Sequence, residues 1–111
     1  MEKTLGKNLE IAKKIITEEA EKAGYKVYSI ILFGSRARGD YKEGSDWDFF
    51  VVTDKNIFKE DMKMILRNIR RRMAVNKISN DIVIKSKDIY KNQKNDIGFL
   101  SYYVNKEGVN I

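Results

Sequence analysis

Apolar residues recur along this chain with two different periods. From residue 5 to residue 20 they return every three or four positions, which predicts an amphipathic helix that ends near Gly24. The same period predicts a second long helix over residues 58–73 and a closing helix from residue 97 that stops before Gly108. The stripe of the first helix consists of Leu5, Leu9, Ala12, Ile16 and Ala20.

Three shorter apolar runs are rich in β-branched and aromatic residues, which is typical of strands. They cover residues 25–33, 46–53 and 82–85. Residues 54–56 offer N-caps for the helix that follows. Residues 86–95 are polar without clear periodicity, which favours a loop or a frayed turn. Alternating helices and strands indicate one α/β domain over residues 1–111, with helices packed against a small sheet.

A tight turn is predicted directly after the first strand, where Gly34 and Ser35 end the apolar run. Backbone N–H groups in such a turn point toward an anion and can hold a phosphate. The simpler alternative is a strand-to-helix turn in which Ser35 caps a short helix. Arg36 and Arg38 follow the turn, so one of them could touch phosphate, or Arg38 could brace the turn by pairing with a nearby carboxylate.

Two aspartates, Asp46 and Asp48, open the second strand. Alternate residues of a strand share one face, with Cα atoms roughly 7 Å apart. Aspartate is depleted in strands and like charges on one face repel, so this pair calls for a compensating cation. Two carboxylates so placed can bracket ions about 3.5–4 Å apart, the separation used in two-metal phosphoryl chemistry. Trp47, between them, is expected to point into the core.

Composition narrows the choice of metal and the setting. The 111 residues include no cysteine and no histidine, so a bound metal would be a hard ion held by carboxylates. We therefore expect magnesium, with manganese as a possible substitute, rather than zinc. With 42% hydrophobic and 34% charged residues, no apolar run of about 20 residues and no secretory signal, we expect a soluble, cytoplasmic protein without membrane contact.

The net charge of +6 comes largely from lysines along helices, where a solvated face is the simpler interpretation, so we do not expect direct nucleic-acid binding. One dense arginine cluster lies at the end of the second long helix: Arg67, Arg70, Arg71 and Arg72. It could complement the helix dipole or dock an acidic partner. Three tyrosines could stack a nucleobase, although packing is the favoured role: Tyr90, Tyr102 and Tyr103.

The spacing of these residues, a Gly-Ser pair followed after ten residues by Asp-x-Asp, resembles the signature of the DNA polymerase beta-like nucleotidyltransferase superfamily. More narrowly, it resembles the minimal nucleotidyltransferases often encoded beside HEPN toxins. That family has a third carboxylate on a later strand, which Asp81 supplies, although Asn80 replaces the usual apolar residue before it. The C-terminal FLSYYVNKEGVNI is similar to the family's closing helix, turn and short strand, and the resemblance implies a mixed sheet.

The resemblance also implies a chemistry for these residues. Asp46 and Asp48 would hold two magnesium ions that bridge a nucleoside triphosphate, and Asp81 would bind the catalytic ion and accept the proton of the attacking hydroxyl. The nucleotide would be held by the residues of the turn, namely Gly34, Ser35, Arg36 and Arg38. The three aspartates would therefore be both the metal ligands and the catalytic residues of a magnesium-dependent nucleotidyltransferase.

The implied acceptor is a tyrosine of a cognate HEPN ribonuclease toxin. The group transferred to it would be AMP from ATP, or the nucleoside monophosphate of another nucleoside triphosphate. Larger members carry a second domain over the site, and a chain of this length leaves no residues for one. The acceptor surface is therefore expected from a partner or from a second copy in a homo-oligomer. Two alternatives remain: nucleotidylation of a small hydroxylated molecule such as an aminoglycoside, and a non-catalytic antitoxin that masks its partner.

Overall fold

A computed structural model of the chain describes residues 2–111, with side chains from residue 6 onward, so Leu5 of the expected stripe lies outside the described side chains. The elements follow one another as α1 (Glu2–Lys22), β1 (Val27–Phe33), α2 (Ser35–Arg38), β2 (Trp47–Thr53), α3 (Lys59–Val75), β3 (Asn80–Ser86), α4 (Lys87–Gln93), α5 (Leu100–Glu107) and β4 (Val109–Asn110).

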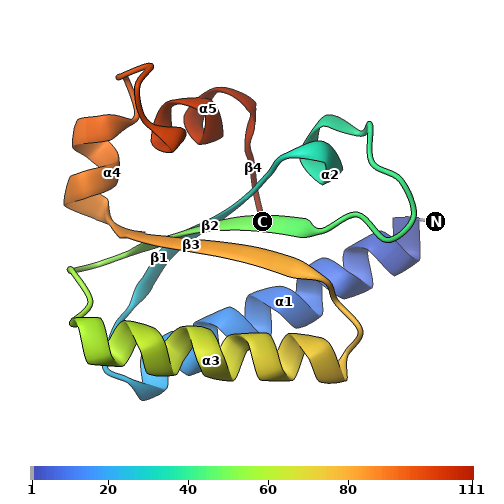
Figure 1. The fold of residues 1–111 in the computed structure, drawn as a ribbon, viewed down its shortest axis with the longest axis horizontal. Coiled ribbons are helices and arrows are strands. Elements are labelled where there is room, and N and C mark those ends of the chain that lie inside the picture. The colour runs from blue at the N-terminus through green and yellow to red at the C-terminus, as the bar shows by residue number, and fades with distance from the viewer. Residues whose placement is uncertain (1) are drawn as a thin grey trace.

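The strands form one mixed sheet in the order β3-β2-β1-β4. β1 is antiparallel to β2 and to β4, whereas β2 and β3 are parallel and are joined through α3. Figure 1 shows α1 and α3 on one face of the sheet and α4 and α5 on the other, with α2 beyond the end of β1. The predicted α/β fold with a small mixed sheet against helices is confirmed.

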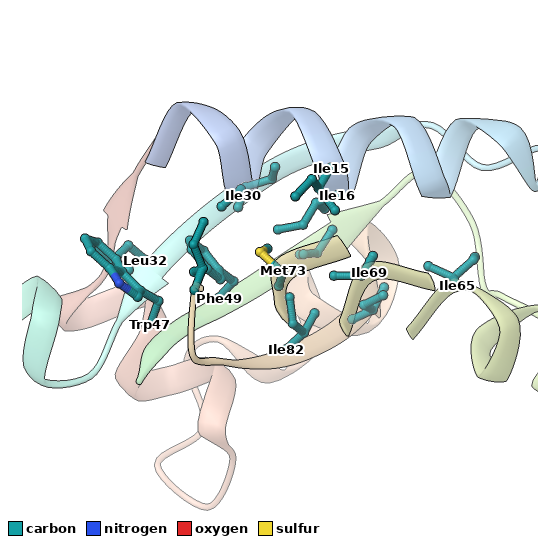
Figure 2. Close-up of a cluster of buried hydrophobic side chains, with 14 of the residues drawn as sticks. Ile15, Ile16, Ile30, Leu32, Trp47, Phe49, Ile65, Ile69, Met73 and Ile82 are labelled. Carbon is teal, nitrogen blue, oxygen red and sulfur yellow. The ribbon is translucent and has the colours of Figure 1, made fainter. Parts of the chain in front are cut away.

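The main core lies between the sheet and the helix pair α1 and α3 (Figure 2). Ile16 of α1 and Ile69 of α3 are fully buried against Phe49 of β2, so the three- and four-residue spacing of each helix matches the face that it buries. Trp47 lies in the same core, as predicted. Within residues 2–111, no helix has both the length and the apolar character that a membrane crossing requires.

Two expectations about the C-terminal third are wrong. The polar residues 86–95 contain a helix, α4, rather than a loop. The Ser86 hydroxyl caps it by accepting the Ile89 N–H at 3.2 Å, and the Tyr90 ring packs 5.3 Å from the Phe50 ring. The closing helix starts at Leu100 rather than at Ile97, which precedes it and is exposed.

The N-cap expected from residues 54–56 is also wrong. α3 begins at Lys59, and no side-chain cap bond is formed by Phe58, the residue at its N-cap position. The hydroxyl of Tyr25 takes this place, because it accepts the Phe58 N–H at 3.2 Å and donates to Asp61 Oδ2 at 2.7 Å. A buried tyrosine on the neighbouring segment thus holds the first turn of α3.

The four arginines of the cluster have two different roles. Arg72 donates from Nη1 to Glu19 and from Nη2 to Glu18, both at 2.8 Å, and so ties α3 to α1. Glu19 is only 3% exposed. Burial favours its neutral form, but Arg72 and Lys22 together lower the pKa of Glu19 below its ordinary value. Arg67, Arg70 and Arg71 remain exposed, so the predicted cluster is a surface of three arginines rather than four.

Arg72→Ala should therefore lower the free energy of unfolding by about 1–3 kcal/mol, because Glu19 keeps only Lys22 as a partner. The loss should persist from neutral pH down to the pH at which Glu19 protonates in the folded protein. A carboxyl group whose pKa is lowered by folding stabilises the folded state at pH values above its unfolded pKa. This stabilisation disappears as pH falls through its folded pKa. Urea unfolding at pH 7 measures the change. Arg71→Ala is the matched control and should stay within about 0.5 kcal/mol of the wild type; equal losses would contradict the assigned role of Arg72.

Candidate active site

Two of the three predicted carboxylates, Asp48 and Asp81, meet where three strands lie side by side. Asp48 is paired in register with Phe33, the last residue of β1, and with Asp81 of β3. Even-numbered residues of β2 face away from the main core, and Phe50 and Val52 pack toward α4 and α5 on that side. Asp48 and Asp81 therefore lie next to each other on the face opposite α1 and α3, at one end of the sheet.

Gly34 directly follows β1 and lies beside the carboxylate of Asp48. Its φ of 75° and ψ of −159° belong to a region that is essentially restricted to glycine. A Cβ atom at Gly34 would collide with Oδ2 of Asp48. Glycine is thus needed here both for the backbone conformation and because the Asp48 carboxylate lies directly against the turn.

Asp46 occupies a different position from the other two carboxylates. It lies just before β2, is exposed, and accepts a hydrogen bond from the Ser79 hydroxyl. Among the described residues, no three acidic side chains are gathered closely enough to form a preassembled metal site. The structure therefore brings Asp48 and Asp81 together and leaves Asp46 directed to Ser79, a residue that sequence reasoning did not single out.

The environment of Asp48 disfavours its charged form. Burial is the largest effect, and the negative charges of Asp81 and Asp46 add to it, so the pKa of the Asp48 carboxyl is raised above its ordinary value. The positive charge of Arg38 opposes this shift only in part. Arg38 is therefore close to Asp48, but it does not neutralise this carboxylate.

The two arginines of the turn have separate positions. The Arg36 guanidinium lies 4.4 Å from the Tyr41 ring centroid and 4.5 Å from that of Trp47, and it donates to the Ser45 carbonyl at 2.9 Å. These contacts hold the loop between α2 and β2. Arg38 is 3.3 Å from Asp40, the bracing pair considered from the sequence, and its Nη1 is 3.9 Å from Glu107 of α5.

The remaining candidates are mainly packing residues. Tyr90 packs on Phe50, and Tyr102 and Tyr103 form an edge-to-face pair with centroids 5.1 Å apart. Asn80 donates from its amide to the Ile78 carbonyl at 3.0 Å, and its buried Oδ1 has no partner among the described residues. An apolar residue, as the resemblance implies for this position, would avoid that unpaired oxygen.

The raised pKa of Asp48 predicts how stability depends on pH. Because the folded pKa lies above the unfolded value of 3.8, the charged carboxylate destabilises the fold, and this cost disappears as pH falls through the folded pKa. In chelator at pH 7, Asp48→Asn should raise the free energy of unfolding by on the order of 1 kcal/mol or less.

The measurement is a pair of thermal melts at each pH from 7 to 4, for the wild type and for Asp48→Asn. The difference in melting temperature between the two proteins should shrink toward pH 4. Glu19, whose pKa is lowered by folding, has the opposite dependence on pH, but it is present in both proteins and so does not contribute to this difference. The exposed Asp96→Asn serves as a control with the same chemical change. A lower melting temperature for Asp48→Asn at pH 7 would mean that protein groups already satisfy this carboxylate.

Two comparisons with known proteins bear on the family of this chain. The family model described as "Nucleotidyltransferase domain" matches residues 12–106, which include the turn and all three aspartates. The chain is also 44% identical over 66 residues to a protein of Methanocaldococcus jannaschii named "Putative protein adenylyltransferase MJ1379". That match covers 57% of this chain and 64% of the relative, so it spans less than two thirds of the relative's length. A family match over most of the chain, with the carboxylates and the glycine turn inside it, shows that the chain belongs to the nucleotidyltransferase domain family.

Proposed function

We propose that the protein is a magnesium-dependent adenylyltransferase that transfers AMP from ATP to a hydroxyl group of a protein acceptor. The observation that carries the proposal is the adjacency of Asp48 and Asp81 against the Gly34 turn. Two adjacent carboxylates, of which Asp48 has a raised pKa, beside a glycine turn at the start of α2 suit a divalent cation bound to a phosphate chain.

The donor set fits a hard divalent ion. All three candidate ligands are carboxylates, and the repulsion felt by Asp48 is of the kind that a cation would offset. Asp46 accepts the bond from Ser79 through Oδ1, so its other oxygen, Oδ2, is the atom that would join Asp48 and Asp81 at a metal. A bound magnesium would supply positive charge to the phosphates and to the reacting oxygen.

The residues of the chain would divide the remaining work. The acceptor oxygen attacks the α-phosphorus, the bond from that phosphorus to the bridging oxygen of the β-phosphate breaks, and pyrophosphate leaves. Asp81, exposed at the edge of the site, accepts the proton of the acceptor hydroxyl. Gly34 and Ser35 bind the departing phosphates through their backbone N–H groups, and Arg38 adds positive charge beside them.

We assign Arg36 a supporting role in this scheme. Its guanidinium is held between two aromatic rings and the Ser45 carbonyl, so its effect on nucleotide binding would be exerted through the position of the loop. Arg38 is the better candidate for direct contact with phosphate, because it is exposed and acts on Asp48.

A protein acceptor is favoured over a small molecule by the name of the Methanocaldococcus relative, "Putative protein adenylyltransferase MJ1379". Within that class we propose a tyrosine of a HEPN-type toxin as the acceptor, with the protein acting as its antitoxin. This assignment rests on the Gly-Ser and Asp-x-Asp spacing and on the closing helix and strand, which the structure places at α5 and β4.

The acceptor can be identified directly. The protein is incubated with ATP labelled at the α-phosphate and with a cognate HEPN protein or a lysate of the source organism, and labelled bands are analysed by mass spectrometry. We expect one dominant acceptor carrying AMP on a tyrosine oxygen. Label only on small molecules would favour the aminoglycoside-type alternative, and tight binding to a HEPN protein without any label would favour a non-catalytic antitoxin.

A further inference from the structure

A groove lies on the α4 side of the sheet, away from the carboxylates. It has a volume of about 460 Å³ and is lined by residues of α4, β1 and β2. Val52 of β2 lies at its base, four residues beyond Asp48 on the same face of the strand, or about 13 Å along it. The groove is thus a separate feature of the surface, of a size typical for small-ligand sites.

One side of α4 gives the groove a positive wall. Lys87, Lys91 and Lys94 follow one another at helical spacings of four and three residues, and all three line the groove. Like charges at these spacings destabilise a helix. Among the side chains that the structure describes, none of the three lysines forms an ion pair. Asp88 is the one acidic residue of the lining, so an anion bound here would relieve a net positive charge.

The opposite wall presents an aromatic ring. Tyr28 is 67% exposed, and the Lys87 Nζ lies 5.5 Å from its ring centroid. The register of β1 against β2 shifts between Val27 and Ser29, so Tyr28 and Ser29 both line the groove, although neighbours in a regular strand face opposite sides. An irregularity of the strand therefore sets an exposed flat ring against a row of lysines.

We propose that this groove binds a nucleotide unit, a flat ring that carries a phosphate, either as a free nucleotide or within a single-stranded nucleic acid. The ring stacks on Tyr28, and the phosphate lies against Lys91 and Lys94. Stacking on an aromatic side chain and lysine contacts to phosphate are the two general sources of affinity for such ligands. The Ser29 hydroxyl and the Asp88 carboxylate are available to the sugar hydroxyls.

The proposal is tested with AMP, observed through backbone amide shifts in the NMR spectrum of the whole protein. Chelator is present throughout, because without a cation the carboxylates of the active site repel phosphate. We expect shifts at Tyr28, Ser29 and α4. The double variant Lys91→Glu/Lys94→Glu should raise the Kd for AMP by about tenfold or more, and Tyr28→Ala by about tenfold.

A matched control carries the same charge change on the other face of the sheet. Lys13 and Lys14 of α1 are both exposed, so Lys13→Glu/Lys14→Glu should change the Kd by less than about threefold at moderate salt. These variants leave the aspartates of the active site unchanged, so the outcome does not depend on the proposed transfer reaction. Adenosine should bind more weakly than AMP, since it lacks the phosphate.

An octamer of uridine separates the two sources of the ligand. Tighter binding of the octamer than of AMP, with a steep loss of affinity as salt increases, assigns the groove to single-stranded nucleic acid; comparable affinity assigns it to a free nucleotide. Either result supports the proposal. Equal Kd values for the wild type and for Lys91→Glu/Lys94→Glu, or AMP-induced shifts confined to the Gly34–Asp48 junction, would overturn it.

Discussion

Asp48→Asn should reduce the rate of nucleotidyl transfer by about a thousandfold or more, a loss of about 4 kcal/mol in transition-state stabilisation. Asparagine keeps the shape of the side chain and removes its charge. Asp48 is the central carboxylate of the site, paired in register with Asp81 and lying against Gly34. The measurement is a single-turnover assay with saturating magnesium ATP and the protein acceptor.

The same variant separates catalysis from folding. In chelator, Asp48→Asn should be at least as stable as the wild type, because the charge of Asp48 is disfavoured in the folded protein. Loss of activity cannot then be attributed to unfolding. Asp96→Asn, an exposed aspartate in the loop before α5, should retain full activity. Transfer within about tenfold of the wild-type rate by Asp48→Asn would place the metal site elsewhere.

Gly34→Ala should impair both stability and transfer. The backbone of Gly34 has φ 75° and ψ −159°, a conformation that costs other residues on the order of 1–3 kcal/mol. In addition, the new methyl group would displace the Asp48 carboxylate. Because misplacement of about 1 Å can cost a hundredfold in rate, we expect at least that loss of activity at temperatures where the variant remains folded. Urea unfolding and the single-turnover assay measure the two effects.

Gly39→Ala is the matched control for this variant. Gly39 also has a positive φ, of 88°, but a Cβ atom there would meet nothing within 4 Å. It should share part of the stability loss and keep most of the activity. If both variants lost activity equally, the proximity of Gly34 to Asp48 would have no special importance.

The candidate site could be located from the sequence because its chemistry is local in the chain. Alternation along a strand places Asp48 opposite to Trp47, and the structure has Trp47 in the core and Asp48 on the other face. The partnership of Asp48 with Asp81 came from the family resemblance, because strand order and register depend on pairing that no local pattern encodes. The same holds for Ser79 and Glu107, which reach Asp46 and Arg38 from distant segments.

The long elements could be predicted because each buries one continuous apolar stripe. α4 could not, because none of its residues is fully buried and it therefore shows no periodic apolar stripe, although Ser86 caps it and Tyr90 packs on Phe50. The capping group of α3 was missed for a similar reason, since it is the hydroxyl of Tyr25, 33 residues before Phe58. The double role of the arginine cluster depends on α1 packing beside α3, which brings Glu18 and Glu19 to Arg72.

The most direct test of the central claim compares two labels on ATP. The protein, magnesium and the acceptor are incubated with ATP labelled either at the α-phosphate or at the γ-phosphate, and the acceptor is isolated. Nucleotidyl transfer predicts stable label from α-labelled ATP, none from γ-labelled ATP, and the loss of both the label and pyrophosphate release in Asp48→Asn. Label from γ-labelled ATP, or α-label of undiminished intensity with Asp48→Asn, would contradict the assignment of this site and its reaction.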